Sequence, residues 1–154
     1  MTTGESLNAL TETIIGAAMI VHSELGPGLL ESAYEACLAL ELEERKLRVE
    51  RQKALPLTYR GTELEFGYRL DLLVNEKVIV EVKAVEALAP IHGAQLLSYL
   101  RLSGCRVGLL LNFNVASLRD GIQRIVNDFP GVEFSSASSA PSAFRAVASP
   151  KEDE

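Results

Sequence analysis

The segment from Tyr68 to Lys83 constrains the fold of this chain more than any other. Apolar side chains alternate along it, as in two strands that each bury one face, at Leu70, Leu72, Val74, Val78, Val80 and Val82. Residues 75–77, Asn-Glu-Lys, interrupt the alternation and predict a three-residue hairpin loop. With that loop, Val74 pairs with Val78, and the register of the whole hairpin is determined.

Counting outward from this pair places Asp71 directly opposite Glu81. Both acids then lie on the face away from the valines, together with Arg69 and Lys83. Like charges in this position repel and destabilise a sheet. A bound divalent cation would remove the repulsion, because Mg²⁺ takes carboxylate oxygens together with a backbone carbonyl, which Val82 can supply. The alternative is a solvated patch of cross-strand salt bridges, and this segment alone does not decide between the two.

Hydrophobic periodicity predicts the elements around the hairpin. We expect helices over 6–24 and 29–46, and strands over 47–59, 64–74 and 77–85. A helix over 90–102, a strand over 106–113 and a short helix over 117–128 follow. A turn is expected at Arg60-Gly61, and Gly104 is expected to cap the helix before it. The order predicts an α/β (α+β) fold in which helices flank a mixed sheet.

The length and composition predict one domain followed by a tail. The 154 residues are 47% hydrophobic and 23% charged, which is typical of a globular chain and excludes collagen or a coiled coil. We expect a single domain over 1–134. Residues 135–154 are rich in Ser, Ala and Pro and end in acids, so we expect a disordered tail there.

The charge distribution bears on possible partners. The net charge of −6 argues against a protein that coats nucleic acid non-specifically. Residues 88–127 nevertheless hold four arginines against Asp120 alone, so a polyanion should contact this half. Cys37 and Cys105 lie in apolar patterns without a metal-binding motif. Because no signal-type or membrane-spanning segment is visible either, we expect a cytoplasmic protein without membrane contact.

Two helical segments add polar groups that suit a site. Glu31 and Tyr34 lie three residues apart on one helix face, after Gly-Pro-Gly. Gln95 and Tyr99 lie four apart, and an amide and a phenol can orient a water or contact a phosphate. Simpler interpretations stay open: Glu31 as an acid favoured in a first helical turn, and Gln95 and Tyr99 as an ordinary amphipathic surface.

The pattern Gly-x-x-Glu-x-x-Tyr at 28–34 resembles the signature of the bacterial GxxExxY proteins, which belong to the PD-(D/E)XK nuclease superfamily. Residues 67–71, 80–83, 92–99 with Arg101, and 108–113 are similar to other stretches of that family, in the same order, and the resemblance covers about 14–126. It implies a restriction-endonuclease-like αβββαβ core. Leu70 stands where Pro is usual, and Asn114 stands where many relatives have Gly.

The resemblance also implies roles for individual residues. Asp71 and Glu81 would be metal ligands, with the Val82 carbonyl, and Glu31 would complete or support the metal site. Lys83 would position water and stabilise charge. Gln95 and Tyr99 match a Gln-x-x-x-Tyr element of related nucleases and join the expected catalytic set. Contacts to the substrate are expected from Tyr34, His92 and Arg101.

The implied reaction is hydrolysis of phosphodiester bonds in DNA with Mg²⁺, for which Mn²⁺ could substitute. A catalytically silent nucleic-acid-binding or protein-interaction module on the same fold is the alternative. RNA is the less favoured substrate, because the sequence shows no aromatic cluster that would stack on splayed bases. Small members of the superfamily often act as dimers or with partners, so the resemblance implies a homodimer or a protein partner for this small chain.

Overall fold

The computed structural model describes residues 2–130, and the tail expected at 135–154 lies outside this range. Helices α1 (Thr3–Leu25) and α2 (Glu31–Glu44) come first. Strands β1 (Val49–Ala54), β2 (Leu57–Tyr59), β3 (Thr62–Leu64), β4 (Arg69–Val74) and β5 (Val78–Lys83) follow. The described chain then forms α3 (Pro90–Ser103), β6 (Val107–Asn112), a 3₁₀ turn (Leu118–Gly121) and β7 (Ile122–Val126).

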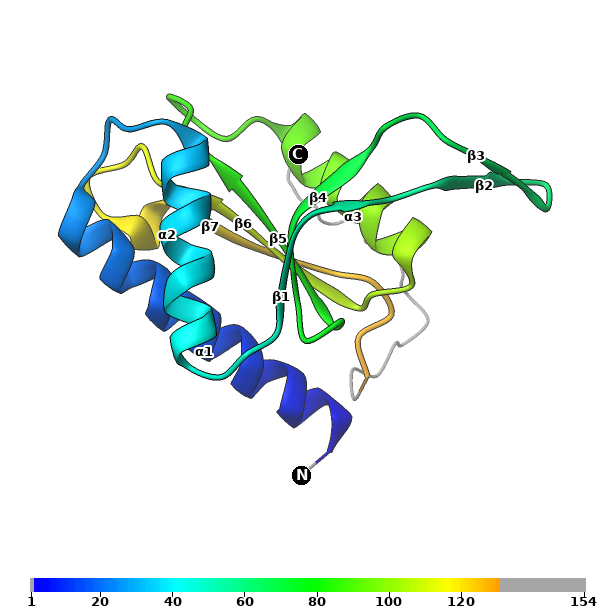
Figure 1. Cartoon of the computed structure of the whole chain (residues 1–154), viewed down its shortest axis with the longest axis horizontal. Coiled ribbons are helices and arrows are strands. Elements are labelled where there is room, and N and C mark those ends of the chain that lie inside the picture. Colours follow the sequence, from blue (N-terminus) through cyan, green and yellow to red (C-terminus); the bar gives the residue numbers. More distant parts are fainter. Residues whose placement is uncertain (1, 131–154) are drawn as a thin grey trace.

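Within the described residues, five strands form the central sheet in the order β1-β4-β5-β6-β7. Strands β5 and β6 are parallel and connected through α3, whereas every other neighbouring pair is antiparallel. Helices α1 and α2 cover one face, and α3 covers the other (Figure 1). The prediction of a mixed sheet flanked by helices is confirmed. No helix of this part of the chain combines the length and apolarity needed to cross a membrane.

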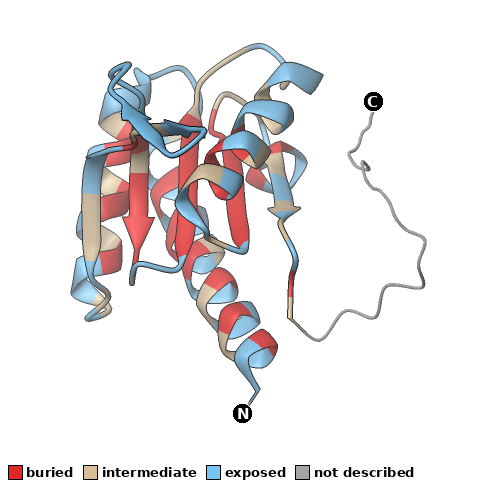
Figure 2. Ribbon diagram, turned by 90° about the vertical axis from the view of Figure 1, so that its right-hand side faces the viewer, coloured by how far each residue is buried: buried red, intermediate tan, exposed pale blue. Residues whose placement is uncertain are grey.

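The core lies on both faces of β5 and β6 (Figure 2). Val78, Val80 and Val82 pack toward α1 and α2, and Ile79 packs toward α3. Strand β6 is buried along its whole length. Strands covered on both faces are apolar throughout, and the Val-Gly-Leu-Leu-Leu run of β6 follows this pattern.

The register predicted for the β4–β5 hairpin is confirmed by the pairs Val74↔Val78 and Leu72↔Val80. One residue of its predicted apolar face was placed wrongly. Leu70 packs in the cluster on the α3 side, although Leu72 packs toward α1 and α2. Gln52, opposite this point on β1, has a left-handed backbone (φ 53°) and forms no ladder pair, so the strands twist between Leu70 and Leu72.

A hairpin arm extends from the sheet where two long strands were expected. The segments 47–59 and 64–74 are each broken, and β2 and β3 pair only with each other. This β2–β3 arm projects past α3 (Figure 1). Its turn is at Arg60-Gly61, as predicted, and both residues have positive φ angles of 51° and 80°. Pro56, which lacks an amide proton, stands at the break between β1 and β2.

The helix predicted over 117–128 is wrong. Only one 3₁₀ turn forms there, and Ile122–Val126 instead adds an antiparallel strand to β6. A Cβ atom on Gly121 would lie 2.3 Å from the Asn112 carbonyl oxygen. The chain therefore passes against β6 at this glycine. The β-branched residues of β7 then favour continued pairing over a helix.

Candidate active site

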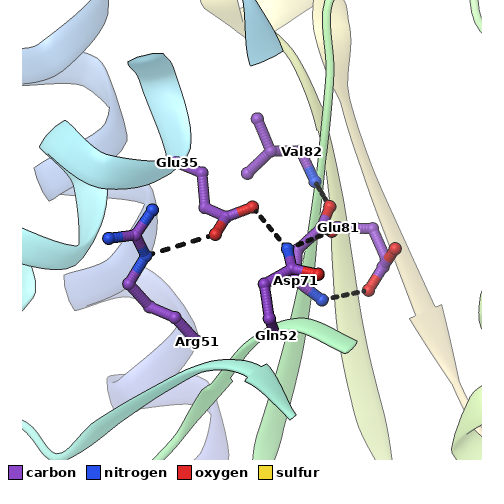
Figure 3. A network of polar contacts seen from close by, with 6 residues as sticks. All are labelled: Glu35, Arg51, Gln52, Asp71, Glu81 and Val82. Carbon is purple, nitrogen blue, oxygen red and sulfur yellow. Dashed lines mark hydrogen bonds and ion pairs between the residues drawn. The ribbon is translucent and has the colours of Figure 1, made fainter. Parts of the chain in front are cut away.

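Asp71 and Glu81 lie side by side where the pairing of β4 with β5 stops. The Asp71 amide donates to Glu81 Oε2 at 3.0 Å, and the Val82 amide donates to Asp71 Oδ2 at 2.9 Å (Figure 3). Beyond the Leu72↔Val80 pair, side-chain carboxylates thus accept the amide protons that carbonyls accept in a regular ladder. The two acids occupy the space between the strands.

Both carboxyl groups have raised pKa values. Burial, followed by the charge of Asp71, raises the pKa of Glu81 to about 8. Burial also raises the pKa of Asp71, against the hydrogen bonds from Val82 and Gln52. Within residues 2–130, no salt bridge joins either acid to a basic side chain, and Glu81 is only 5% exposed. A solvated salt-bridge patch does not describe this pair.

The site includes a buried glutamate that the sequence analysis missed. Glu35, one turn beyond Glu31 on α2, is 7% exposed. It accepts hydrogen bonds from Gln52 Nε2 at 2.9 Å and Arg51 Nε at 3.2 Å. The same Gln52 nitrogen lies 3.3 Å from Asp71 Oδ1, so it bridges two carboxylates (Figure 3). The i, i+4 spacing from Glu31 was the available signal for Glu35.

Glu31 and Lys83 both lie near the end of β5. Glu31 is exposed, and its Oε2 accepts the amide of Ala84 at 3.1 Å, which ties the start of α2 to the residue after Lys83. Lys83 is half-buried, and its charge opposes the raised pKa of both Asp71 and Glu81. The two strand acids, Glu31 and Lys83 therefore share one electrostatic neighbourhood.

His92, Gln95 and Tyr99 approach from α3. Burial, then the Lys83 charge, lowers the pKa of His92, whose Nδ1 accepts the Ala89 amide at 2.9 Å. A pocket of about 300 Å³ is lined by Leu57, Tyr68, Gln95, Ser98, Tyr99 and Leu102. Tyr99 is 8% exposed, and burial and the Glu81 charge raise its pKa. One lining residue of the pocket, Tyr99, is thus near enough to Glu81 for the charge of that carboxylate to act on it.

The predicted substrate contact of Tyr34 is wrong. This side chain is fully buried, and its ring stacks on Phe113 with the centroids 4.6 Å apart. Its hydroxyl donates to the Gly26 carbonyl at 2.5 Å and accepts the Leu29 amide at 3.1 Å. Tyr34 thus holds the loop that leads into α2 and cannot reach a ligand.

Arg101, the other predicted substrate contact, lies exposed in the last turn of α3.

Asn112 fixes the segment that follows Lys83. It is 1% exposed, accepts the Val85 amide at 3.0 Å and donates to the Val85 carbonyl at 3.0 Å. The Phe113 amide also donates to the Lys83 carbonyl at 2.9 Å. These bonds anchor the end of β5 to β6.

The ligand types at the site fit a hard divalent cation, although the side chains are not gathered around one point. Among the described residues, no three His, Cys, Asp or Glu side chains converge closely enough to hold a metal ion. Two adjacent acids, Glu81 buried and Asp71 half-buried, both with raised pKa values, nevertheless favour a positive charge between them, and their oxygens are the ligands that Mg²⁺ prefers. The Gln52 amide, the positive end of a dipole, lies between Asp71 and Glu35.

A family model of the PD-(D/E)XK nuclease superfamily matches residues 8–125, which include every strand of the sheet except the last residue of β7. The chain belongs to this superfamily, and its five-stranded mixed sheet has the corresponding restriction-endonuclease-like architecture. No curated protein and no solved structure shows a significant match to the chain.

Proposed function

We propose that this protein is a GxxExxY-type member of the superfamily and hydrolyses phosphodiester bonds in DNA with Mg²⁺, or Mn²⁺, as the cofactor. The observation that carries the proposal is the Asp71–Glu81 pair, a half-buried and a buried acid at the point where strand pairing stops, with Lys83 two residues beyond Glu81. The superfamily supports nuclease activity in general. The complete Gly-x-x-Glu-x-x-Tyr pattern at 28–34 supports the narrower assignment.

In this proposal Asp71 and Glu81 hold the cation, with the Val82 carbonyl beside them. Glu31 and Glu35, on successive turns of α2, are the candidates for a further ligand, and Glu35 is already linked to Asp71 through Gln52. When bound, the cation would lower the pKa of a water and neutralise charge on the scissile phosphate.

The remaining chemistry falls to side chains of β5 and α3. Hydrolysis adds a water oxygen to phosphorus and releases an alcohol, so negative charge develops on the phosphate oxygens. Lys83, adjacent to both acids, would stabilise that charge and orient the attacking water. Gln95 and Tyr99 line the neighbouring pocket and can donate hydrogen bonds to a phosphate or a water. His92 and the exposed Arg101 are candidates for contacts to the DNA backbone.

The test is cleavage of a supercoiled plasmid with Mg²⁺ or Mn²⁺. Asp71→Ala and Lys83→Ala should each abolish nicking. Lys77→Ala, which removes an exposed lysine from the loop of the same hairpin, should leave it unchanged. Equal nicking by all four proteins would indicate a contaminating nuclease and contradict the proposal.

A second function is favoured by the Gln52 bridge. An amide between Glu35 and Asp71 satisfies both carboxylates without a metal, as expected of a silent binding module. Calorimetric titration with Mn²⁺ separates the two functions. Binding that is lost in Asp71→Ala supports the nuclease, whereas the absence of any binding supports the silent module.

The cellular setting is part of the same proposal. Cys37 and Cys105 are both free thiols and half-buried, which suits a reducing compartment such as the cytoplasm. A homodimer or a protein partner would supply the DNA-binding surface that a small acidic chain lacks. Light scattering of the purified protein, with and without DNA, tests this part directly.

A further inference from the structure

Three aromatic rings form a continuous strip from the β2–β3 arm to the candidate active site, although the sequence suggested no aromatic cluster. The Phe66 and Tyr68 rings lie 6.1 Å apart, and the Tyr68 and Tyr99 rings also lie 6.1 Å apart. Residues 66 and 68 belong to the segment that joins the arm to β4, and residue 99 belongs to α3. The fold thus brings together rings from two distant parts of the chain.

The burial of the rings changes along this aromatic strip. Phe66 is 60% exposed, Tyr68 is 41% exposed and Tyr99 is 8% exposed. Tyr99 packs in the α3-side cluster with Ile79, which lies two residues before Glu81 and therefore on the same face of β5. The strip thus leads from open solvent toward Glu81, whose carboxylate accepts the Asp71 amide. Its inner end borders the pocket of about 300 Å³ that also contains Gln95.

Exposed aromatic faces in a row beside a pocket can be covered by a partner that presents flat rings of its own. Base stacking on such side chains is worth about 1–3 kcal/mol per base and is tolerant of sequence. In a duplex the base faces are already stacked on each other. A pocket of about 300 Å³ is at the lower end of the range for ligand sites, and it suits one unpaired nucleotide rather than a double helix.

The absence of net charge on the arm supports base stacking as the main source of binding affinity. Between residues 55 and 69, Arg60 and Arg69 are balanced by Glu63 and Glu65, so the arm has no net charge with which to attract phosphates. The Arg69 guanidinium also donates to the Gln52 carbonyl at 3.3 Å. Binding through the arm should accordingly depend less on salt than binding through phosphate contacts.

We propose that the aromatic strip of Phe66, Tyr68 and Tyr99 stacks the unpaired bases of single-stranded DNA and leads the strand to the carboxylates. This assignment of substrate class rests on the proposed nuclease function. It concerns binding, however, and can be measured without cleavage.

The test is fluorescence anisotropy of a labelled oligothymidylate, in EDTA, with the full chain. Phe66→Ala and Tyr68→Ala should each weaken binding about five- to tenfold. Tyr68→Phe keeps the ring and should bind within about twofold of the parent protein. Tyr59→Ala is the matched control, because Tyr59 is also 60% exposed on the arm but lies outside the strip, and it should behave like the parent. The single strand should bind more tightly than a duplex of equal length.

Several results would overturn the proposal. One is equal binding of the oligothymidylate by Phe66→Ala and the parent protein. The others are tighter binding of the duplex than of the single strand, and tighter binding of an RNA oligomer of the same length than of the DNA oligomer. A change from dimer to monomer in Phe66→Ala, with DNA binding unchanged, would instead show that the strip is an interface between copies. If Phe66→Ala binds the oligomer like the parent protein and still nicks plasmid, the stacking proposal is wrong but the proposed nuclease function stands. If Tyr68→Ala loses oligomer binding but the parent protein never nicks DNA, the stacking proposal stands and the proposed nuclease function is wrong.

Discussion

The main-chain amide of Asp71 donates to the carboxylate of Glu81 across 3.0 Å, so the backbone itself holds the two acids of the site together. Burial, followed by the charge of the neighbouring Asp71, opposes ionisation of Glu81. Without a cation, this pair places a cost on the fold that grows as the pH rises.

Glu81→Gln should therefore stabilise the metal-free protein in alkaline solution and change little in acid. The pKa of Glu81 is raised from 4.5 to about 8 in the folded state. The parent protein therefore keeps its full free energy of unfolding below the unfolded-state pKa of Glu81. It loses part of that free energy as the pH rises through the folded-state pKa of Glu81. Glutamine still accepts the Asp71 amide but does not ionise. We expect a gain of about 1–3 kcal/mol at a pH of about 9.

Urea unfolding in EDTA at several pH values measures this gain. Glu63→Gln, on the exposed arm, is the control and should show no pH-dependent difference. A difference between Glu81→Gln and the parent protein that stays constant with pH would contradict the prediction.

Gln52→Ala should destabilise the metal-free protein by about 1–2 kcal/mol, because the buried carboxylate of Glu35 loses its amide donor. Gln52→Gly also lacks the amide, but glycine suits the left-handed backbone at this position. The glycine variant should be more stable than the alanine variant by about 1 kcal/mol. Equal unfolding midpoints and slopes for the two variants would mean that the backbone at residue 52 relaxes freely.

Tyr34→Phe should cost about 1–3 kcal/mol of stability, because it leaves the Gly26 carbonyl and the Leu29 amide without their partner. Tyr68→Phe removes a more exposed hydroxyl and should stay within about 0.5 kcal/mol of the parent. Thermal unfolding compares the two variants. DNA affinity in Tyr34→Phe should be unchanged, and weaker DNA binding without loss of stability would restore a substrate role for Tyr34.

Glu35→Gln should reduce the affinity for Mn²⁺ by about tenfold or more, because one of the carboxylates around Asp71 is neutralised. Glu43→Gln neutralises an exposed acid of the same helix and should have no effect. Isothermal titration calorimetry provides the affinities. Unchanged binding in Glu35→Gln would remove Glu35 from the ligand set but leave Asp71 and Glu81 in it.

That Asp71 and Glu81 are neighbours was predictable, because a three-residue loop determines the register of a hairpin. How they meet did not follow from the two-residue period of a strand, because ladder pairing stops at Leu72↔Val80 and each acid accepts a backbone amide of the other strand. The order of helices and strands up to β6 was also visible, apart from the breaks that separate β2 and β3 from β1 and β4, since buried strands and amphipathic helices differ in period.

Contacts across distant segments were not predictable in the same way. The Gln52 bridge depends on a left-handed residue in β1 and on the packing of α2 against the sheet. The aromatic strip depends on how the β2–β3 arm lies relative to α3. Strand β7 was mistaken for a helix because its short segment lacks a clear period, and tertiary pairing with β6 decides its structure.

The β2–β3 arm forms hydrogen-bonded pairs only with itself, whereas Asp71, Glu81 and Lys83 belong to strands of the central sheet. Changes in the arm's length or side chains therefore need not shift the strands that carry these three residues. In such a protein the arm and the adjoining segment that carries Phe66 and Tyr68 could be exchanged as one module, while the residues proposed for bond cleavage stay in place.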